Sequence, residues 1–222
     1  MSDRDRFDAN LAAKAMRMGE RAPRQPERRP QETTPVDLTR ARAQLAEQAL
    51  PELFRAARVA DAPDVLRADL EAWVADPVRN LVLLGKVGHG KSHLAAAAVA
   101  AAYRRHGAPA RFVWTTVAAL MERSRPDGDD DGGPGLAVCR RAPVLVLDDL
   151  GAERATDWTT ERLGLLVDQR WSAGLPIVVT ANLAAGPDGP LMAHTGERTY
   201  SRLVGGALVA RVEETDRRRN PQ

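Results

Sequence analysis

Apolar and polar positions along the chain predict strands and helices in turn. Continuous apolar runs have the length of buried strands, and the longer segments between them have helical spacing. The first predicted strand begins at Leu81, and the later ones cover 110–114, 143–149 and 175–180. The predicted helices cover 93–105, 117–123 and 157–172. This alternation predicts an α/β fold with a mostly parallel sheet, helices on both faces and the chemistry at the strand ends.

The helical segments also predict which side chains face the core. The helix at 157–172 is expected to present four side chains inward, namely Leu163, Leu166, Val167 and Trp171. The region 36–76 is helical in pattern, with a break at Pro51. Its apolar positions near helical spacing are Leu38, Leu45 and Ala49 before the break and Val65, Leu66, Leu70 and Trp73 after it.

Residues 1–35 have the composition of a tethered peptide rather than of a domain. A short helix is expected at 10–18, with Leu11, Ala15 and Met18 on one face, before a linker rich in proline and arginine. This flexible segment either docks in the groove of a partner or stays a disordered tail. The expected domains are 1–35, a helical lead-in at 36–76, a core at 77–217 and a basic tail at 218–222.

The composition is that of a soluble protein with one substantial core, since 44% of the 222 residues are hydrophobic and 28% are charged. No apolar run approaches the roughly 18 residues of a membrane span, and residues 1–10 lack the apolar core of a signal peptide. We therefore expect a cytoplasmic protein without a membrane partner. Cys139 is the only cysteine, which excludes an intrachain disulfide and predicts a buried small side chain.

The net charge of +2 gives no bulk attraction to nucleic acid, although the arginines can still gather in a local basic patch. The loop PDGDDDGGPG at 126–135 carries four aspartates, three of them consecutive. It lacks the terminal glutamate of a calcium-binding loop, so a solvated loop is favoured over a calcium site.

The most informative chemistry lies directly after the first strand, in the sequence GKVGHGKS. This Gly-x4-Gly-Lys-Ser spacing between a strand and a helix is typical of a loop that binds the phosphates of a nucleotide. The glycines let the backbone turn its amides inward, Lys91 bridges the terminal phosphates and the Ser92 hydroxyl holds Mg²⁺. The expected cofactor-binding residues in this loop are Gly85, Lys86, Val87, Gly88, His89, Gly90, Lys91 and Ser92.

Two carboxylates and an amide follow apolar strands further along the chain. Asp148 and Asp149 end the run PVLVLDD, and Asn182 follows the strand predicted to end at residue 180. Asp148 is expected to join the magnesium shell, and Asp149 to orient or deprotonate an attacking water. The alternative is that the two carboxylates only cap the following turn. Asn182 is in place to reach the same water, but asparagine is also a common turn residue.

Hydrolysis of a nucleotide also needs positive charge near the terminal phosphate, and late arginines are candidates for it. These arginines are Arg198, Arg202 and Arg217. Spacing alone favours ordinary surface arginines. The alternative is that one of them acts across a subunit boundary and another within its own subunit.

Four motifs in this order resemble the AAA+ helicase loaders of the DnaC type and their relatives, the IstB transposition ATPases: GKVGHGKSHLA, VLVLDDLGAE, IVVTANL and GERTYSRL. The resemblance covers roughly 50–217. It implies an AAA+ P-loop core with ATP and Mg²⁺ as cofactors. Little or no helical lid is expected, because only about forty residues follow Asn182 and they include the strand-like ALVARVE.

The resemblance also implies a role for each matching residue. It adds His93 to the nucleotide contacts and makes Asn182 the sensor of the terminal phosphate and Arg202 the arginine finger. Arg217 resembles the second sensor arginine, with Arg218 as the alternative.

Contacts to single-stranded DNA are implied around 115–125, with Arg123 and Arg125 as candidate phosphate contacts. A solvated helix end is the alternative. Phe112 and Trp114 are the only aromatic side chains nearby, and both are expected in the core, so stacking groups for single strands are scarce.

Three functions remain open at this point. The leading hypothesis is an ATP-controlled loader whose N-terminal segment grips a hexameric replicative helicase while the core self-associates and binds single-stranded DNA. The runner-up is a helper ATPase for a transposase, with double-stranded target DNA. The third is a nucleotide-binding adaptor without productive hydrolysis. Asp149 stands where many related ATPases carry glutamate, which predicts slow hydrolysis that assembly or DNA stimulates.

Overall fold

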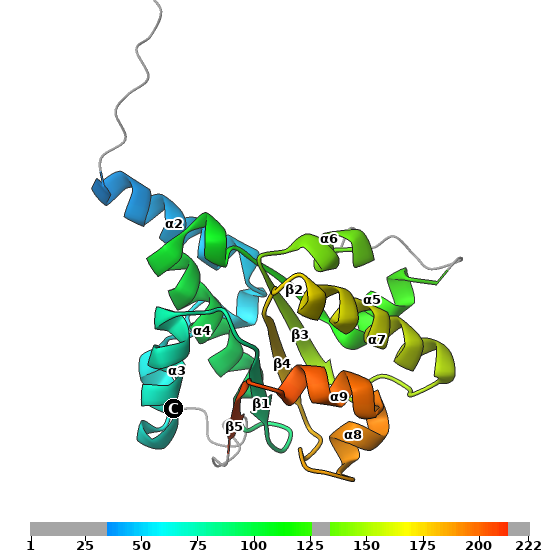
Figure 1. Cartoon of the computed structure of the whole chain (residues 1–222). Coiled ribbons are helices and arrows are strands. Elements are labelled where there is room, and N and C mark those ends of the chain that lie inside the picture. The colour runs from blue at the N-terminus through cyan, green and yellow to red at the C-terminus, as the bar shows by residue number, and fades with distance from the viewer. Residues whose placement is uncertain (1–34, 126–133, 213–222) are drawn as a thin grey trace, which may run out of the picture. The chain divides into compact units, whose positions relative to one another are not determined.

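The structure is a computed structural model and describes residues 35–125 and 134–212 of the chain (Figure 1). Residues 36–222 belong to one compact unit. The described strands are β1 (Leu81–Leu84), β2 (Phe112–Thr116), β3 (Val144–Leu150), β4 (Ile177–Ala181) and β5 (Leu208–Arg211). The described helices are α2 (Pro35–Ala49), α3 (Asp64–Ala75), α4 (Lys91–His106), α5 (Val117–Arg123), α6 (Leu136–Arg141), α7 (Asp157–Ser172), α8 (Pro190–Thr195) and α9 (Glu197–Val204), with short 3₁₀ turns at η1 (Glu52–Phe54), η2 (Val59–Asp61) and η3 (Ala108–Ala110).

The five strands form one parallel sheet in the order β2-β3-β4-β1-β5. The predicted parallel sheet is therefore confirmed. β2 begins two residues later than the predicted strand, because Ala108–Ala110 form a 3₁₀ turn before it. Since all strands run in the same direction, their carboxyl ends lie together at one edge of the sheet and their amino ends at the other.

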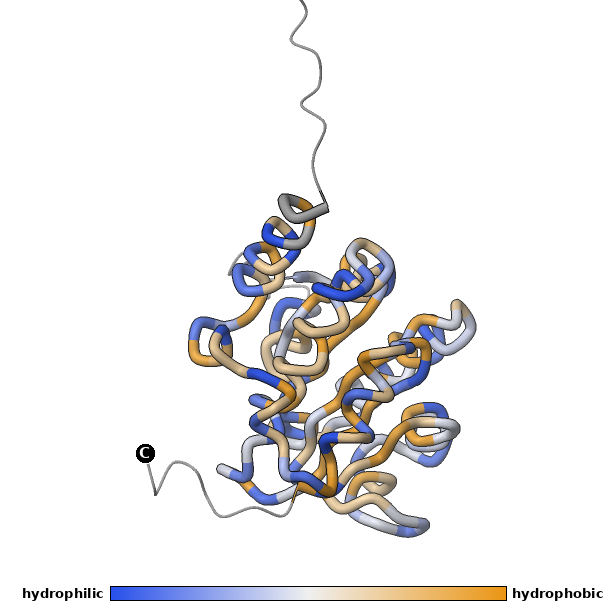
Figure 2. The backbone as a smooth tube through the Cα atoms, turned by 90° about the vertical axis from the view of Figure 1, so that its left-hand side faces the viewer, coloured by the Kyte–Doolittle hydropathy of each residue, from blue (hydrophilic) through white to orange (hydrophobic). Residues whose placement is uncertain are grey.

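Helices cover both faces of the sheet, and each face has its own hydrophobic core (Figure 1). One core joins the sheet to α2, α3 and α4, and the other joins it to α5, α6, α7, α8 and α9. In Figure 2 the tube changes between orange and blue within the helices, as expected for helices that bury one side. Cys139 is fully buried, as predicted, and no helix among the described residues is both long and apolar enough to cross a membrane.

Two helices begin and pack in ways that their sequences explain. The side chain of Thr156 caps α7 by accepting a hydrogen bond from the Thr159 N–H at 3.2 Å. α4 is rich in alanine, and its residues 95–98 are completely buried. Small side chains let this helix lie close to the sheet, so the phosphate loop that precedes it is attached to the most buried helix of the fold.

The prediction that Trp171 faces inward is wrong, because 59% of this residue is exposed. The buried face of α7 consists of Leu163, Leu166, Val167 and Arg170. In an α-helix, a residue seven positions after Leu163 returns to within about 20° of the same direction, whereas one eight positions later lies about 80° away. Arg170 therefore occupies the inward position, and Trp171 turns to the surface.

In the lead-in helices, some of the apolar positions that the pattern predicted to be buried are exposed. In α2 Ala46 is buried, as is Leu50 directly after the helix, while Leu38 and Leu45 are about half exposed. In α3 the predicted Leu66, Leu70 and Trp73 are buried, but Val65 is 83% exposed. These helices pack against the same core as α4, so only the stripe that meets α4 is covered.

Arg170 is a fully buried arginine that ties three segments together at the amino edge of the sheet. Its guanidinium donates hydrogen bonds to the carbonyl oxygens of Cys139 and Ala142, at 2.7 and 2.9 Å, and of Pro176, at 2.7 Å. Burial lowers the pKa of Arg170 to about 10, so the side chain is still charged at neutral pH. The charge is thus dispersed over backbone carbonyls, and the Pro176 carbonyl also accepts a hydrogen bond from the Leu145 N–H at 3.3 Å.

We expect Arg170→Met to lower the free energy of unfolding by about 3–5 kcal/mol, because it leaves several buried carbonyls without their donor. Urea unfolding followed by circular dichroism measures this loss. The matched control is Gln169→Met, at an exposed neighbouring position, which is expected to change stability by less than about 0.5 kcal/mol. Equal stabilities of the two variants would contradict the structural role of Arg170.

Candidate functional site

The loop between β1 and α4 takes a shape that depends on its glycines. Gly90, the residue before α4, has a left-handed backbone with φ of 88°. Because glycine has no side chain, the first N–H groups of α4 have no capping side chain and can serve a ligand. At Gly85, a Cβ atom would lie 2.4 Å from the Val212 carbonyl oxygen, so only glycine allows the chain after β5 to pass this closely.

Lys91 joins the two ends of the loop to the neighbouring strand. Its ammonium group donates hydrogen bonds to the Lys86 carbonyl oxygen at 2.9 Å and to Asn182 Oδ1 at 2.7 Å. The residue is buried, with 5% exposed. A cation held beside a backbone turn and the end of β4 provides positive charge for a phosphate group placed in the loop.

Ser92, in the first turn of α4, and Asp148, in β3, are brought together at the carboxyl edge of the sheet. The Ser92 hydroxyl donates to Asp148 Oδ1 at 2.7 Å, and the buried Thr180 hydroxyl donates to the same oxygen at 2.6 Å. Burial raises the pKa of Asp148, while these two hydrogen bonds act in the opposite direction. A hydroxyl beside a buried carboxylate is a pair of oxygen donors that suits Mg²⁺.

Asp149 lies next to this pair in a strained backbone conformation. Its φ of 55° is unusual for a residue other than glycine, and the pairing of β3 with β4 shifts register between Leu147 and Leu150. The N–H of Asp149 donates to Thr180 Oγ1 at 2.9 Å, which holds the strained turn in place. Such strain is concentrated at functional sites.

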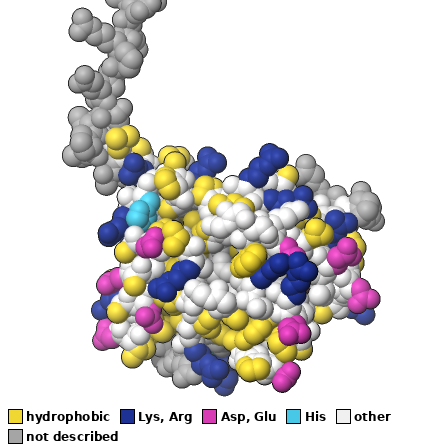
Figure 3. Space-filling model, in the orientation of Figure 1, with side chains coloured by type: hydrophobic (Ala, Val, Ile, Leu, Met, Phe, Trp, Pro, Cys, Tyr) yellow, Lys and Arg dark blue, Asp and Glu magenta, His cyan; other side chains and the backbone are white. Residues whose placement is uncertain are grey.

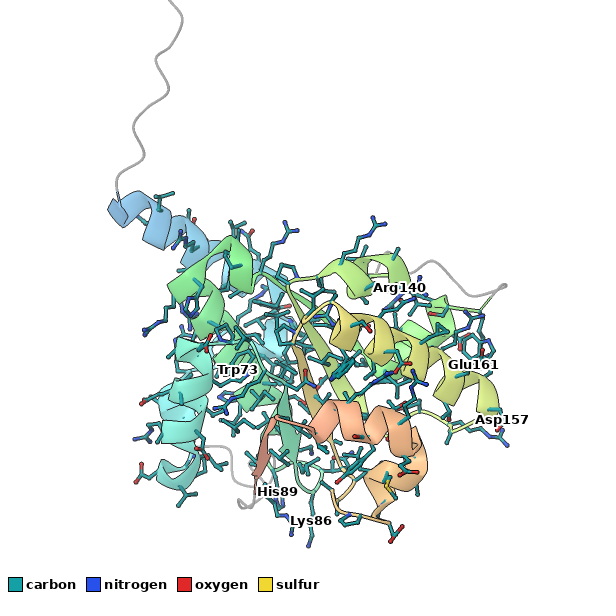
Figure 4. All side chains as sticks on the ribbon, viewed as in Figure 1. Trp73, Lys86, His89, Arg140, Asp157 and Glu161 are labelled. Carbon is teal, nitrogen blue, oxygen red and sulfur yellow. The ribbon has the colours of Figure 1, made fainter. Side chains whose placement is uncertain are left out.

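The remaining predicted loop residues surround the site. Lys86 and Val87 are exposed, whereas Gly88 is half-buried. His89 Nδ1 lies 3.1 Å from the Val212 carbonyl oxygen, and His93 Nε2 lies 2.7 Å from Asp61 Oδ2 of the lead-in. Figure 4 shows Lys86 and His89 together at the carboxyl edge of the sheet. His93, in the first turn of α4, therefore contacts the lead-in through its ring and also lines the cavity beside the loop.

A cavity of about 390 Å³ opens between this loop and the lead-in. Its walls include Leu53 and Phe54 from η1, the glycine loop with Lys91 and Ser92, and the polar side chains Asp149 and Asn182. A second cavity, of about 410 Å³, lies beside Gly85, His89 and Arg211 and also reaches Asn182. The first cavity contains most of the predicted phosphate and water residues, so we assign the phosphate site to it.

Sequence reasoning missed a hydrogen-bonded contact between a glutamate and a histidine that supports the acidic turn. Glu153 Oε2 accepts a hydrogen bond from the Gly151 N–H at 2.9 Å, and Glu153 Oε1 lies 2.7 Å from His194 Nε2 on α8. The side chains of Glu153 and His194 are 6% and 15% exposed. The acidic residue in LGAE is a visible signal, but nothing in the pattern connects it with a histidine 41 positions later.

Several predicted residues lie away from the site or outside the described residues. Arg202 lies on α9, pairs with Asp168 and stacks over Trp171 at 5.0 Å from the ring centre. Arg123 donates to Thr115 Oγ1 at 2.7 Å, while Arg125 is exposed. Predictions that lie outside the described residues concern Arg217, Arg218, the helix at 10–18 and the aspartates of the loop 126–133. Within the described part, no group of three or more His, Cys, Asp or Glu side chains suits a metal ion.

The residues present suit a nucleotide with Mg²⁺. The left-handed Gly90 exposes the start of α4, Lys91 supplies a buried cation, and Asp148 with Ser92 supplies oxygen donors for a cation. A strand, a glycine loop and a helix with these side chains, in a five-stranded parallel sheet, define the P-loop class of ATP-binding proteins.

Within this class, the particular family follows from the sequence. The family described as "IstB-like ATP binding protein" matches residues 20–190, which is more than half of the chain, and the chain belongs to this family. A relative described as an ATP-binding protein in an insertion sequence of Mycobacterium tuberculosis is 32% identical over 145 residues. The match covers 64% of this chain and 57% of that relative, so it spans little more than half of the relative's length.

Solved structures show the same fold. The crystal structure of the DnaC helicase loader matches with a TM-score of 0.63 and 22% identity, covering 73% of this chain and 100% of that chain. The crystal structure of DnaI matches with a TM-score of 0.60 and 22% identity, covering 78% of this chain and 98% of that chain. The predicted AAA+ P-loop fold and the predicted family are confirmed, and at this identity the structural likeness concerns the fold alone.

We expect Lys91→Ala to weaken ATP binding by at least about 100-fold, equivalent to about 2.8 kcal/mol, because the loop loses its buried cation. Titration with a fluorescent ATP analogue measures the affinity. Lys86→Ala is the matched control, since the Lys86 side chain is exposed and only its carbonyl group contacts Lys91. Equal losses in both variants would contradict the role of Lys91.

Proposed function

We propose that this chain is a Mg²⁺-dependent ATPase that serves the transposase of an insertion sequence. The observation that carries this proposal is the family match together with the 32% identical insertion-sequence relative. This choice reverses the order of the two leading sequence hypotheses, because the likeness to helicase loaders concerns the fold alone.

The site supports hydrolysis as well as binding. Ser92 and Asp148 would hold Mg²⁺, which neutralises charge on the phosphates when bound. Asp149 is held beside them by the Thr180 hydrogen bond and would orient the attacking water. Asn182, which already contacts Lys91, would sense the terminal phosphate. The short carboxylate of Asp149 agrees with slow turnover that needs a stimulus.

The stimulus would come from Arg202 of a neighbouring copy of the chain. Asn80, which precedes β1, donates to the Arg202 carbonyl oxygen at 3.0 Å, so this part of α9 lies at the amino edge of the sheet. The phosphate site lies at the carboxyl edge, roughly 13 Å away along four strand residues. The Arg202 side chain is therefore directed at a surface remote from its own phosphate site, and its action as a finger requires self-association.

We expect Arg202→Ala to keep ATP affinity within about threefold but to lower assembly-stimulated hydrolysis by about 10³-fold, the contribution of an arginine finger. Phosphate release measured over a series of protein concentrations tests this expectation. Arg198→Ala is the informative comparison, because Arg198 also pairs with Asp168, at 3.0 Å, but is 74% exposed. Loss of stimulation in Arg198→Ala alone would assign the finger to Arg198.

A helicase loader is the second candidate, and the fold favours it. The chain covers the whole of the matched chain in the DnaC loader structure, and the sequence motifs include those shared by both groups. In that case residues 1–35 would grip a replicative helicase, and Arg123 and Arg125 would contact single-stranded DNA. The nucleotide site would have the same residues in either function.

The client protein distinguishes the two candidates. We expect the full-length chain to capture the transposase encoded beside its gene in the presence of ATP, and to capture the host replicative helicase no better than an unrelated protein. Lys91→Ala is the control for dependence on ATP. Capture of the helicase without the transposase would replace the proposed function with helicase loading.

A further inference from the structure

The amino edge of the sheet, opposite the phosphate site, is rich in arginine and poor in acidic residues. The segments that lead into β2, β3 and β4 contain no acidic residue between positions 99 and 121, 134 and 147, or 169 and 176. Five arginines lie in the first two of these segments, namely Arg104, Arg105, Arg111, Arg140 and Arg141. Because the whole chain has a net charge of only +2, this edge has a local excess of positive charge.

The fold brings these arginines into one row. The Val144 N–H donates to the Arg111 carbonyl oxygen at 3.1 Å, which places the start of β2 beside the residues that follow Arg141. Arg42 of α2 extends the row, since a Cβ atom on Gly107 would lie 2.8 Å from its guanidinium carbon. In Figure 3 dark blue side chains lie along the upper edge of the surface, without magenta ones among them, and further dark blue side chains lie in the middle and at the bottom of this face. Figure 4 places Arg140 at this end and Lys86 at the other.

Few of these charges are neutralised within residues 35–125 and 134–212. No ion pair involves Arg105, Arg111 or Arg141 in this part of the chain. Arg104 has a lowered pKa because of burial and, second, because of the nearby charge of Arg58, and the negative charge of Glu47 opposes the shift.

The favourable effect of a cation at a helix C-terminus explains the presence of some of these arginines, but it does not explain the whole row. Cations are favourable in the last turns of α4 and α6, where carbonyl groups point outward. Arg111 has an extended backbone and caps only the three-residue 3₁₀ turn η3, which is too short for a sizeable helix dipole. An exposed arginine at this position, next to the ends of two basic helices, adds to the repulsion, which an anionic partner would relieve.

We propose that the amino-edge arginines, defined as Arg42, Arg104, Arg105, Arg111, Arg140 and Arg141, bind the phosphate backbone of double-stranded DNA. Guanidinium groups bind phosphates in bidentate geometry, and backbone binding needs no base contacts. A single strand would be held by stacking, but Phe112 is buried and Trp114 packs against Phe54, with the rings 5.7 Å apart. The exposed Trp171 is already stacked with Arg202, at 5.0 Å from the ring centre.

This inference rests on the proposed function in one respect, since an ATPase that serves a transposase acts on duplex DNA. The inference also assigns DNA and nucleotide to separate sites. DNA at the amino edge and nucleotide at the carboxyl edge contact opposite ends of the same strands, so both can be bound at once. The surface differs from the one around Arg123, the last residue of α5, and Arg125, two residues later. The Arg123 side chain already binds Thr115.

The test is the salt dependence of duplex binding by full-length protein. Fluorescence anisotropy with a labelled random-sequence duplex, between about 50 and 200 mM salt, gives the slope of log K against log salt concentration. We expect Arg111→Gln/Arg141→Gln to lower the magnitude of this slope by about 1.8, or about 0.9 for each lost phosphate contact, and to weaken binding roughly tenfold or more. ATP affinity and the unfolding midpoint verify that the variant is folded.

Two comparison variants make the result specific. Arg154→Gln removes an exposed arginine from the turn after β3 and is expected to leave the slope unchanged. Arg123→Gln/Arg125→Gln tests the alternative DNA surface. An unchanged slope in Arg111→Gln/Arg141→Gln overturns the inference, and a lowered slope in Arg123→Gln/Arg125→Gln alone moves the DNA to α5.

The remaining outcomes separate this inference from the proposed function. Displacement of duplex by polyglutamate at equal charge concentration would assign the arginine row to an acidic protein partner and overturn the proposal. If the wild-type chain binds no duplex, the inference fails, and capture of the transposase decides the function independently. If the wild-type chain binds duplex with the same slope as the double variant, the inference fails while the proposed function stands.

Discussion

The Thr180 hydroxyl group is the interaction on which the geometry of the site depends. It donates one hydrogen bond to the Asp148 carboxylate and accepts one from the Asp149 N–H, so a single side chain of β4 fixes both acidic residues of β3. The register shift between Leu147 and Leu150 makes room for this arrangement, because Asp149 leaves the strand pattern there. Without a polar group at this buried position, the strained turn would have no partner from β4.

Much of this site could be predicted because its signals are local. The apolar runs, the glycine spacing and the acids at a strand end each occupy a few consecutive residues, and parallel strands bring their ends together whatever their order. The loop, Asp148 and Asn182 could therefore be placed at one edge of the sheet from the sequence alone. The AAA+ fold could be predicted from the motifs for the same reason.

The remaining features depend on contacts between distant segments, which a pattern does not contain. Arg170 takes the inward position of α7 because backbone carbonyls from two other segments surround it, and this displaces Trp171 to the surface. Likewise, the pairing of Glu153 with His194 depends on where α8 lies. The helices α6, α8 and α9 contain six to eight residues each, which is too short for a clear helical period.

The close approach of Val212 to the phosphate loop has a mechanical consequence. Its N–H donates to the Leu84 carbonyl oxygen at 2.7 Å, and its own carbonyl oxygen lies against Gly85 and His89. The residue after β5 thus limits the movement of the loop, since the start of the loop has no space to move toward it. Any change of loop shape that shifts Gly85 toward Val212 must also displace Val212. The phosphate loop and the end of β5, which are far apart in sequence, are therefore expected to move together.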